Sequence, residues 1–210
     1  MNSFLKKIKT KKGKLVVVCL LLFLIYWFSL PNPLFRSPTS TVINDAKGNL
    51  LGALIADDGQ WRFPYDENVP DKFRQSIIQF EDRAFTYHMG VNIFSTGRAL
   101  IQNIKSGRKV SGGSTLTMQV IRLSRQGKSR TVLEKIIEII LATRLELTYS
   151  KKEIMALYAS NAPFGGNVVG LEAASWRYFG RKTSELSWAE SAMLAVLPNA
   201  PSLIYPGKNH

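Results

Sequence analysis

A carboxylate at the end of an amphipathic run, Glu81, is the first residue of this chain whose type and spacing suggest chemistry. It lies four residues after Ile77 and three after Ile78, so on a helix it would share their apolar stripe. A carboxylate beside apolar surface is partly desolvated, which makes it a plausible general base. The alternative is a helix C-terminus with a local ion pair between Asp82 and Arg83, and the spacing alone leaves both interpretations open.

A segment rich in glycine and hydroxyl groups, SGGSTLTMQ at 111–119, could present backbone N–H groups and hydroxyls to a phosphate. It is not a P-loop, because no Gly-Lys-Ser/Thr follows at the required spacing, and a loop capped by Ser114 into a helix is the alternative. Basic side chains follow within 122–130. They are either solvated surface or an anion-binding cleft suited to a diphosphate.

A second carboxylate, Glu138, is flanked by isoleucines in EKIIEIIL. Lys135, one turn earlier, could pair with it, whereas Glu134 at i−4 carries the same charge and would repel it. Without further information, Glu138 is interpreted as the exposed polar edge of a helix.

The composition excludes several classes of protein. One cysteine, Cys19, and two histidines, His88 and His210, exclude a disulfide framework, a cysteine-based zinc site and a histidine-rich metal centre. The length of 210 residues allows one domain, and 45% hydrophobic residues can fill its core. A net charge of +13 indicates an anionic partner, namely nucleic acid, an acidic membrane surface or a phosphorylated substrate.

The N-terminal elements predict a membrane location. Residues 1–14 hold six lysines and no acid, and an uncharged run follows at 15–30. We predict a basic cytoplasmic leader over 1–14 and a single transmembrane anchor over 15–31, with the remaining chain outside the cytoplasm. At about 1.5 Å per residue the run is slightly shorter than a ~30 Å hydrocarbon core. A cleaved signal peptide is the alternative, but the run ends in bulky residues without a small-x-small site. This topology disfavours nucleic acid as a partner.

The elements that would position the candidate residues are mostly helical. Residues 32–66 predict a Pro/Ser linker followed by a small β-hairpin element near 41–65. From Pro70 onward, the pattern predicts helices over 71–81, 131–147, 151–159 and 188–197. Capping-box patterns, Ser/Thr-x-x-Glu, begin the last two. We therefore expect a mainly α fold rather than an alternating βαβ chain.

Five segments, in order, resemble the motifs of the peptidoglycan glycosyltransferases of glycosyltransferase family 51, found in class A penicillin-binding proteins. They are EDRAFTYHMG at 81–90, GGSTLTMQ at 112–119, EKIIE at 134–138, YSKKEIMALY at 149–158 and YFGRKTSELSWAESAMLAVLPNAPS at 178–202. The resemblance implies a mainly α, lysozyme-like glycosyltransferase domain over 67–210, behind one N-terminal transmembrane helix.

The same resemblance implies a membrane-anchored enzyme that polymerises lipid II into glycan strands and releases undecaprenyl diphosphate. Its implied partners are lipid II, the growing glycan strand, the cytoplasmic membrane and other cell-wall synthesis proteins, with no nucleic acid. The implied location is the bacterial cytoplasmic (inner) membrane, crossed once, with the N-terminus in the cytoplasm and the catalytic domain on the outer, periplasmic face. A divalent metal, Mg²⁺ or Mn²⁺, is the one cofactor that the resemblance allows, and no organic cofactor is expected.

Residue roles follow from the matching motif positions. Glu81 would take the proton from the acceptor sugar's 4-hydroxyl, and Glu138 would help to hold the donor's diphosphate, directly or through the metal. The other implied substrate-binding residues are Asp82, Arg83, Phe85, His88, Gly90, Gly113, Ser114, Thr115, Gln119, Arg122, Lys135 and Lys151. A diphosphate leaving group needs one base and positive charge rather than the acid and base carboxylates of a hydrolase.

Some features depart from the family pattern. Glu134 stands where members commonly have arginine, and the transpeptidase patterns Ser-x-Asn and Lys-Thr-Gly do not occur. The chain also ends close after the fifth motif, so we expect a C-terminally truncated glycosyltransferase domain with no transpeptidase domain in this chain. The alternative function is a truncated, inactive lipid II-binding or scaffold relative, and a weaker one is a lysozyme-like hydrolase.

Overall fold

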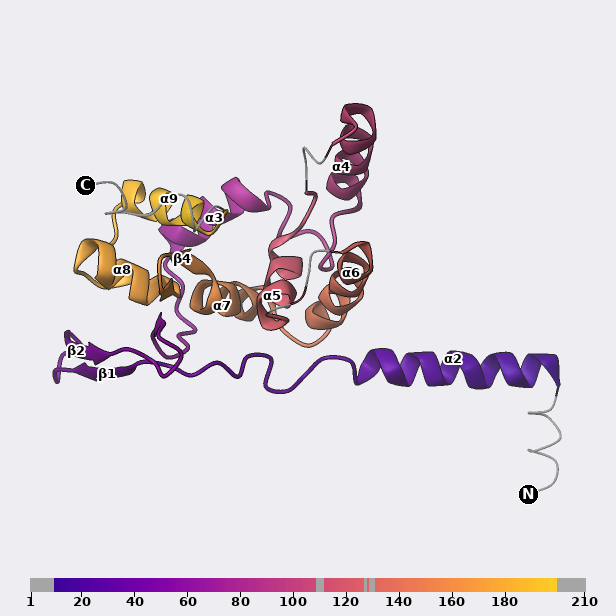
Figure 1. The fold of residues 1–210 in the computed structure, drawn as a ribbon, viewed down its shortest axis with the longest axis horizontal. Coiled ribbons are helices and arrows are strands. Elements are labelled where there is room, and N and C mark those ends of the chain that lie inside the picture. Colours follow the sequence, from indigo (N-terminus) through magenta and orange to yellow (C-terminus); the bar gives the residue numbers. More distant parts are fainter. Residues whose placement is uncertain (1–9, 109–111, 127, 129–130, 200–210) are drawn as a thin grey trace, which may run out of the picture. The chain divides into compact units, whose positions relative to one another are not determined.

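The structure is a computed structural model that describes residues 10–108, 112–126, 128 and 131–199 (Figure 1). It divides into two compact units, Met1–Leu34 and Phe35–His210. Most of the predicted basic leader and the end of the fifth motif lie outside the described residues.

The first unit contains one helix, α2 (Lys11–Trp27), among its described residues. It begins at Thr10, whose hydroxyl accepts a hydrogen bond from Gly13 N at 3.0 Å. The anchor was predicted over 15–31. The helix has 17 residues, begins before that range at Lys11 and ends within it at Trp27. In the described part of the chain, no helix is both long enough and apolar enough to cross a membrane.

The second unit holds two small sheets. The predicted hairpin is confirmed as β1 (Thr41–Asn44) paired antiparallel with β2 (Leu50–Leu54). The strand β3 (Trp61–Arg62) pairs in parallel with β5 (Val168–Val169), which also pairs with β4 (Pro163–Gly165). The segment after the hairpin is therefore fixed by a strand far along the chain.

The remaining elements of the second unit are helical, which confirms the predicted mainly α fold. They are α3 (Asp71–Glu81), α4 (Ile93–Ser106), α5 (Leu116–Ser124), α6 (Val132–Glu146), α7 (Lys151–Asn161), α8 (Leu171–Phe179), α9 (Trp188–Val196) and the 3-10 turns η1 (Thr183–Glu185) and η2 (Leu197–Asn199). Both predicted capping boxes are formed, at Ser150 and Ser187. They satisfy backbone N–H groups that have no partner within the helix.

The short helix α5 lies at the centre of this unit. It packs against both α6 and α7, while α3 packs along α9 (Figure 1). Leu116, Met118, Val120 and Ile121 of α5 are fully buried, so the core fixes the helix on several sides. Polar side chains on the same helix, such as Gln119, are therefore held in defined positions.

Candidate active site

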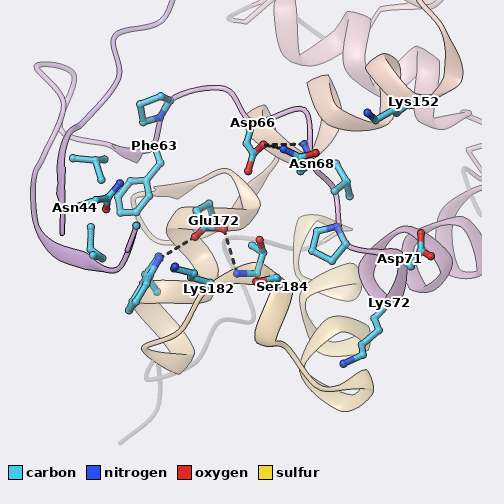
Figure 2. Close-up of a pocket in the computed structure, with 18 residues that line it drawn as sticks. Asn44, Phe63, Asp66, Asn68, Asp71, Lys72, Lys152, Glu172, Lys182 and Ser184 are labelled. Carbon is cyan, nitrogen blue, oxygen red and sulfur yellow. Dashed lines mark hydrogen bonds between the residues drawn. The ribbon is translucent and has the colours of Figure 1, made fainter. Parts of the chain in front are cut away.

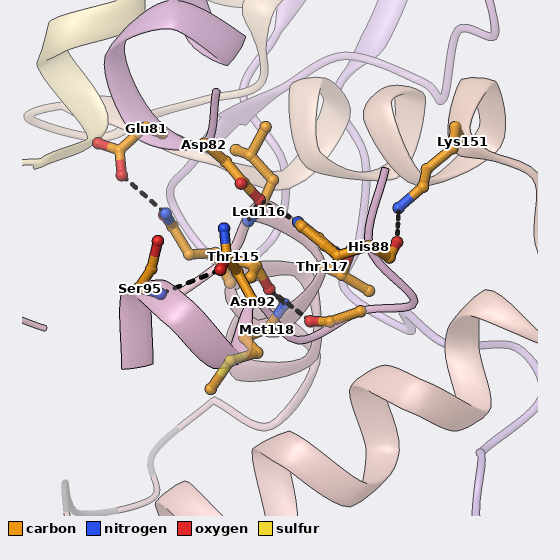
Figure 3. Close-up of polar contacts among 12 residues, drawn as sticks. Glu81, Asp82, His88, Asn92, Ser95, Thr115, Leu116, Thr117, Met118 and Lys151 are labelled. Atoms are coloured by element: carbon orange, nitrogen blue, oxygen red, sulfur yellow. Dashed lines mark hydrogen bonds and ion pairs between the residues drawn. The ribbon is translucent and has the colours of Figure 1, made fainter. Parts of the chain in front are cut away.

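Glu81 is the last residue of α3, and its carboxylate faces α5 (Figure 3). Its Oε2 accepts a hydrogen bond from Gln119 Nε2 at 2.8 Å. Ile77, one turn earlier, is fully buried and Glu81 is half-buried, as the apolar stripe predicts. A half-buried carboxylate oriented by an amide is able to accept a proton from a bound hydroxyl.

The neighbouring carboxylate, Asp82, joins two helices. The structure does not contain the alternative ion pair of Asp82 with Arg83: Asp82 Oδ2 lies 2.8 Å from His88 Nε2 and accepts a hydrogen bond from Leu116 N at 3.0 Å (Figure 3). Arg83 instead donates to the carbonyl of Gln79. Leu116 is the first residue of α5, so Asp82 fixes the end of α3 to the start of α5. This connection brings Glu81 to Gln119.

The segment before α5 is capped by Thr115 and not by Ser114. Thr115 Oγ1 accepts a hydrogen bond from Met118 N at 3.1 Å and donates one to the carbonyl of Gly90 at 2.6 Å. Gly113 also lies close to α4, since a Cβ there would be 2.9 Å from Thr96 Cα. The Thr115 hydroxyl therefore joins the second motif to the carbonyl of Gly90 in the first motif, and the Ser114 hydroxyl is left for other contacts.

Gly90 is expected to tolerate no side chain. Its φ is +82°, and a Cβ would lie 2.6 Å from the carbonyl oxygen of Ala142. Gly90→Ala should lower the free energy of unfolding by more than the roughly 1–2 kcal/mol that a left-handed backbone costs, because backbone must also move. Urea unfolding measures this change in the free energy of unfolding. Gly59→Ala is the matched control, since Gly59 has φ +73° and nothing within 4 Å of the added carbon. Equal losses in both variants would contradict the close contact.

A cluster of cations lies between α5 and α6. Arg122 donates from Nε and Nη2 to the two carboxylate oxygens of Glu138, both at 2.8 Å. The side chain of Glu138 is 7% exposed, so the interpretation as an exposed polar edge is wrong. Hydrogen bonding to Glu138 raises the pKa of Arg122, and the charge of Glu81 adds to this effect. Arg122 therefore lies within electrostatic range of both glutamates.

Lys135 belongs to the same cluster through Ser114. Its Nζ donates to Ser114 Oγ at 2.6 Å and to the carbonyl of Gly112 at 3.2 Å, rather than to Glu138 as the helix spacing allowed. Arg122 Nη2 donates to the same hydroxyl at 3.1 Å. The structure thus brings together four residues that we call the cation cluster, namely Ser114, Arg122, Lys135 and Glu138.

The unusual Glu134 of the third motif has its own partner. Its Oε1 accepts a hydrogen bond from Arg125 Nε at 2.7 Å, which makes a second ion pair between α5 and α6. This contact removes Arg125 from the group of basic residues available to an anion. Of the rest of that predicted group, Lys128 is exposed and residues 129–130 lie outside the described part of the chain.

The groups around Glu138 bear on the predicted divalent ion. Both carboxylate oxygens of Glu138 already accept hydrogen bonds from Arg122. Among the described residues, no three His, Cys, Asp or Glu side chains are grouped to hold a metal. Mg²⁺ at phosphate sites is usually held by one or two carboxylates together with substrate phosphates and water, so a divalent ion bound with the diphosphate stays a prediction. The positive charge that the protein itself supplies here is that of Arg122 and Lys135.

Lys151 connects the first, second and fourth motifs through a buried carboxylate. Its Nζ donates to the carbonyl of His88 and to Glu146 Oε1, both at 2.7 Å, and lies 4.5 Å from the ring centre of Phe85. Glu146 also accepts a hydrogen bond from Thr117 at 2.6 Å. Glu146 was not predicted from the sequence, because it lies outside the motifs and no spacing distinguishes it from other charged residues of α6.

Replacement of Lys151 is expected to destabilise the fold. Lys151→Met should lower the free energy of unfolding by roughly 2–3 kcal/mol, because Glu146, 3% exposed at its side chain, would keep a buried charge without its cation. Urea denaturation followed by circular dichroism checks this. The adjacent Lys152→Met is the control, since Lys152 is exposed and should change stability by less than about 0.5 kcal/mol. A loss of stability in Lys152→Met and none in Lys151→Met would contradict this role for Lys151.

A cavity of about 970 Å³ lies elsewhere on the unit (Figure 2). It is lined by residues of the hairpin, the start of α3 and α8, and none of the predicted site residues lines it. Among the carboxylates that line it, Glu172 accepts hydrogen bonds from Trp176 Nε1 at 2.9 Å and from Thr183 N at 3.2 Å. Because no residue of the predicted site lines this cavity, the candidate site remains the one around Glu81.

Comparison with known proteins gives a consistent set of relatives. Residues 47–210 match the model of the Transglycosylase family. Penicillin-binding protein 1C of Escherichia coli (strain K12) is 43% identical over 209 residues, covering 96% of this chain and 27% of that protein. Penicillin-binding protein 1A of Aquifex aeolicus is 39% identical over 195 residues, covering 90% of this chain and 26% of that protein. Penicillin-binding protein 1F of Bacillus subtilis is 36% identical over 175 residues, covering 81% of this chain and 24% of that protein.

These matches agree with the resemblance found in the five motifs. The chain spans about a quarter of the length of the curated relatives that it matches. The family model covers all five motif segments, including Glu81 and Glu138. The chain therefore belongs to the transglycosylase family, the glycosyltransferase family 51 domain of class A penicillin-binding proteins.

Proposed function

We propose that this chain is a peptidoglycan glycosyltransferase that polymerises lipid II into glycan strands and releases undecaprenyl diphosphate. The observation that carries the proposal is that one helix, α5, serves both groups: its Gln119 holds the half-buried Glu81 at 2.8 Å, and its Arg122, one turn later, belongs to the cation cluster. A glycosyl transfer from a diphosphate donor needs this combination of a base and positive charge.

Glu81 acts as the base in the proposed reaction. It takes the proton from the 4-hydroxyl of the acceptor sugar while that oxygen forms a bond to the anomeric carbon of the donor. The bond from that carbon to the diphosphate oxygen breaks, and the electron pair leaves with undecaprenyl diphosphate. Gln119 orients the carboxylate through its 2.8 Å hydrogen bond, so the base is aimed before substrate arrives.

The cation cluster stabilises the leaving diphosphate. Negative charge grows on the departing oxygen, and Arg122 and Lys135 supply preorganised donors for it. Glu138 holds the Arg122 guanidinium by two hydrogen bonds to Nε and Nη2, which fixes the direction of the remaining Nη1. In this proposal Glu138 positions Arg122 and needs no metal to do so.

Exposed apolar side chains support the proposal that the protein acts at a lipid surface. On α4, Ile93, Phe94, Ile101 and Ile104 are exposed, with Phe94 at 91%. Val132 and Leu133 at the start of α6 are exposed as well, and most apolar side chains of α2 are exposed. Several exposed apolar side chains on one helix are typical of membrane or partner contact. We place the catalytic domain at the outer face of the bacterial cytoplasmic membrane, where a lipid-linked substrate would be held close to it.

A lipid II polymerisation assay tests the proposed function. The purified chain, with lipid II in detergent or vesicles, should give glycan polymers that separate from monomer on a gel. Binding of lipid II without polymer would support the scaffold alternative. Release of reducing ends from finished peptidoglycan without turnover of lipid II would support a hydrolase.

A further inference from the structure

The cavity of about 970 Å³ has no part in the reaction described above (Figure 2). Its walls come from segments that are far apart in the sequence, namely the β1–β2 hairpin, the segment that leads into α3, the helix α8 and the turn η1. Its volume lies at the upper end of the roughly 300–1,000 Å³ that is typical of ligand pockets. The cavity is therefore large enough for a ligand of more than one ring.

Hydrogen bonds within the protein hold the walls of this cavity in place. Lys182 Nζ donates to the carbonyl of Lys47 at 3.3 Å, which connects the segment before η1 to the turn of the hairpin. Glu172 accepts hydrogen bonds from Trp176 Nε1 and from Thr183 N, which connects α8 to η1 and fixes the indole. A preformed site loses less conformational freedom on binding than a site that the ligand must order.

Two aromatic side chains, Phe63 and Trp176, line the cavity. Both are half-buried, so each leaves part of its ring exposed. The face of an aromatic ring is negative and attracts polarised C–H groups. A sugar ring carries such C–H groups on its faces, so this pair of aromatic side chains suits a saccharide.

The charged groups of the lining balance one another. They are the lysines Lys72, Lys152 and Lys182 and the acids Asp66, Asp71 and Glu172. A diphosphate or a nucleic acid would therefore meet no excess of positive charge in this cavity. A sugar hydroxyl both donates and accepts hydrogen bonds, so it can bind to an ammonium group and to a carboxylate alike.

Two side chains of the lining, Asn44 and Lys152, have donors to offer a ligand. Both residues are exposed, and within the described part of the chain neither side chain makes a hydrogen bond. Glu172 accepts one hydrogen bond at each carboxylate oxygen, and each oxygen has a second lone pair. The cavity thus combines fixed aromatic rings with both donors and acceptors.

We propose that this cavity is a second saccharide site, which binds a stretch of the glycan strand away from Glu81. The choice of glycan as the ligand rests on the proposed function, in which the enzyme itself makes this polymer. The helix α3 connects the two sites, because Glu81 is its last residue and its first residue, Asp71, lines the cavity. At about 1.5 Å per residue, the two ends of this helix are roughly 16 Å apart.

A second site at this distance would retain the product. A strand bound at the cavity keeps its other sugars close to Glu81, because linking two contacts raises the effective concentration at the second one. We therefore expect the cavity to affect how long a strand becomes before it is released.

Titration with chitotetraose, a soluble tetramer of N-acetylglucosamine, tests the second site. In the full chain labelled with nitrogen-15 at tryptophan, the indole signal of Trp176 is assigned through Trp176→Phe. This signal should shift with added sugar and reach saturation. The dissociation constant read from it should increase by about three- to tenfold in Asn44→Ala and in Lys152→Met, because each variant removes a donor to the ligand.

Lys47→Met is the matched control for Lys152→Met. Lys47 is an exposed lysine of the hairpin turn whose side chain does not line the cavity, so its dissociation constant should equal that of the wild type. Glu81→Gln should also bind the sugar as the wild type does. An unshifted Trp176 signal, or equal weakening in Lys47→Met and Lys152→Met, overturns the second site. A shift caused by a tetrapeptide and not by the sugar overturns it in favour of a peptide site.

Polymerisation separates this inference from the proposed function. If the wild type polymerises lipid II, Asn44→Ala should give shorter strands than the wild type and Lys47→Met strands of equal length. If the sugar shifts the Trp176 signal and the wild type makes no glycan, the proposed function fails while the saccharide site stands. If the wild type makes glycan and the sugar leaves this signal unchanged, only the second site is wrong.

Discussion

Glu81→Gln is expected to lower the rate of lipid II polymerisation by about 10²–10⁴-fold, the contribution typical of a general base. The substitution keeps the size and shape of the side chain but removes its ability to accept the acceptor's proton. Gln119 can still approach the remaining carbonyl oxygen, so the local packing is retained. The measurement is the initial rate of polymer formation at saturating lipid II, with folding checked by thermal denaturation.

Glu185→Gln is the control for this prediction. Glu185 is an exposed carboxylate on η1, and its replacement should leave the rate within about twofold of the wild type. A Glu81→Gln variant that folds normally and retains most of the activity would show that another group accepts the proton.

Glu138→Gln is expected to lower both stability and activity. An amide offers only one acceptor atom in place of the two carboxylate oxygens that Arg122 now uses, so one hydrogen bond and the ion pair are lost. We expect the free energy of unfolding to fall by roughly 2–3 kcal/mol. The polymerisation rate should fall by about 10²-fold or more, because Arg122 is no longer held beside Ser114.

Glu134→Gln separates these two effects. It breaks a similar ion pair, with Arg125, between the same two helices, but that pair makes no contact with Ser114. Its unfolding free energy should fall by roughly 1–2 kcal/mol while the rate stays within about twofold. If both variants lose activity equally, the loss comes from the α5–α6 packing and not from the cation cluster.

Local patterns predicted most helices of the second unit. The apolar stripe before Glu81 and the two capping boxes depend on residues a few positions apart, and the helices α3, α7 and α9 begin where the pattern predicts. The pairing of β3 with β5 was not predicted, because its partners, Trp61 and Val168, are far apart in the sequence. Such pairing depends on how the chain packs and leaves no local signal.

The side-chain partners at the site were harder to predict. Helix spacing allowed Lys135 to pair with Glu138, but the residue that pairs with Glu138 is Arg122, on another helix. Spacing also suggested a pair between Asp82 and Arg83, whereas Asp82 turns inward to His88. Sequence spacing predicts which residues are neighbours on one helix. Contacts between helices depend on which helix faces pack together in the core.

The sequence by itself determined the family, the mainly helical class and the two glutamates, because each is expressed in residue types at short spacing. Only the tertiary structure decided what surrounds those glutamates, namely Gln119 at Glu81 and Arg122 at Glu138. The physical reason is the packing of α5 against α6 and α7, which buries polar groups from separate segments together. Buried polar groups select their partners by geometry, and that geometry exists only once the helices have packed.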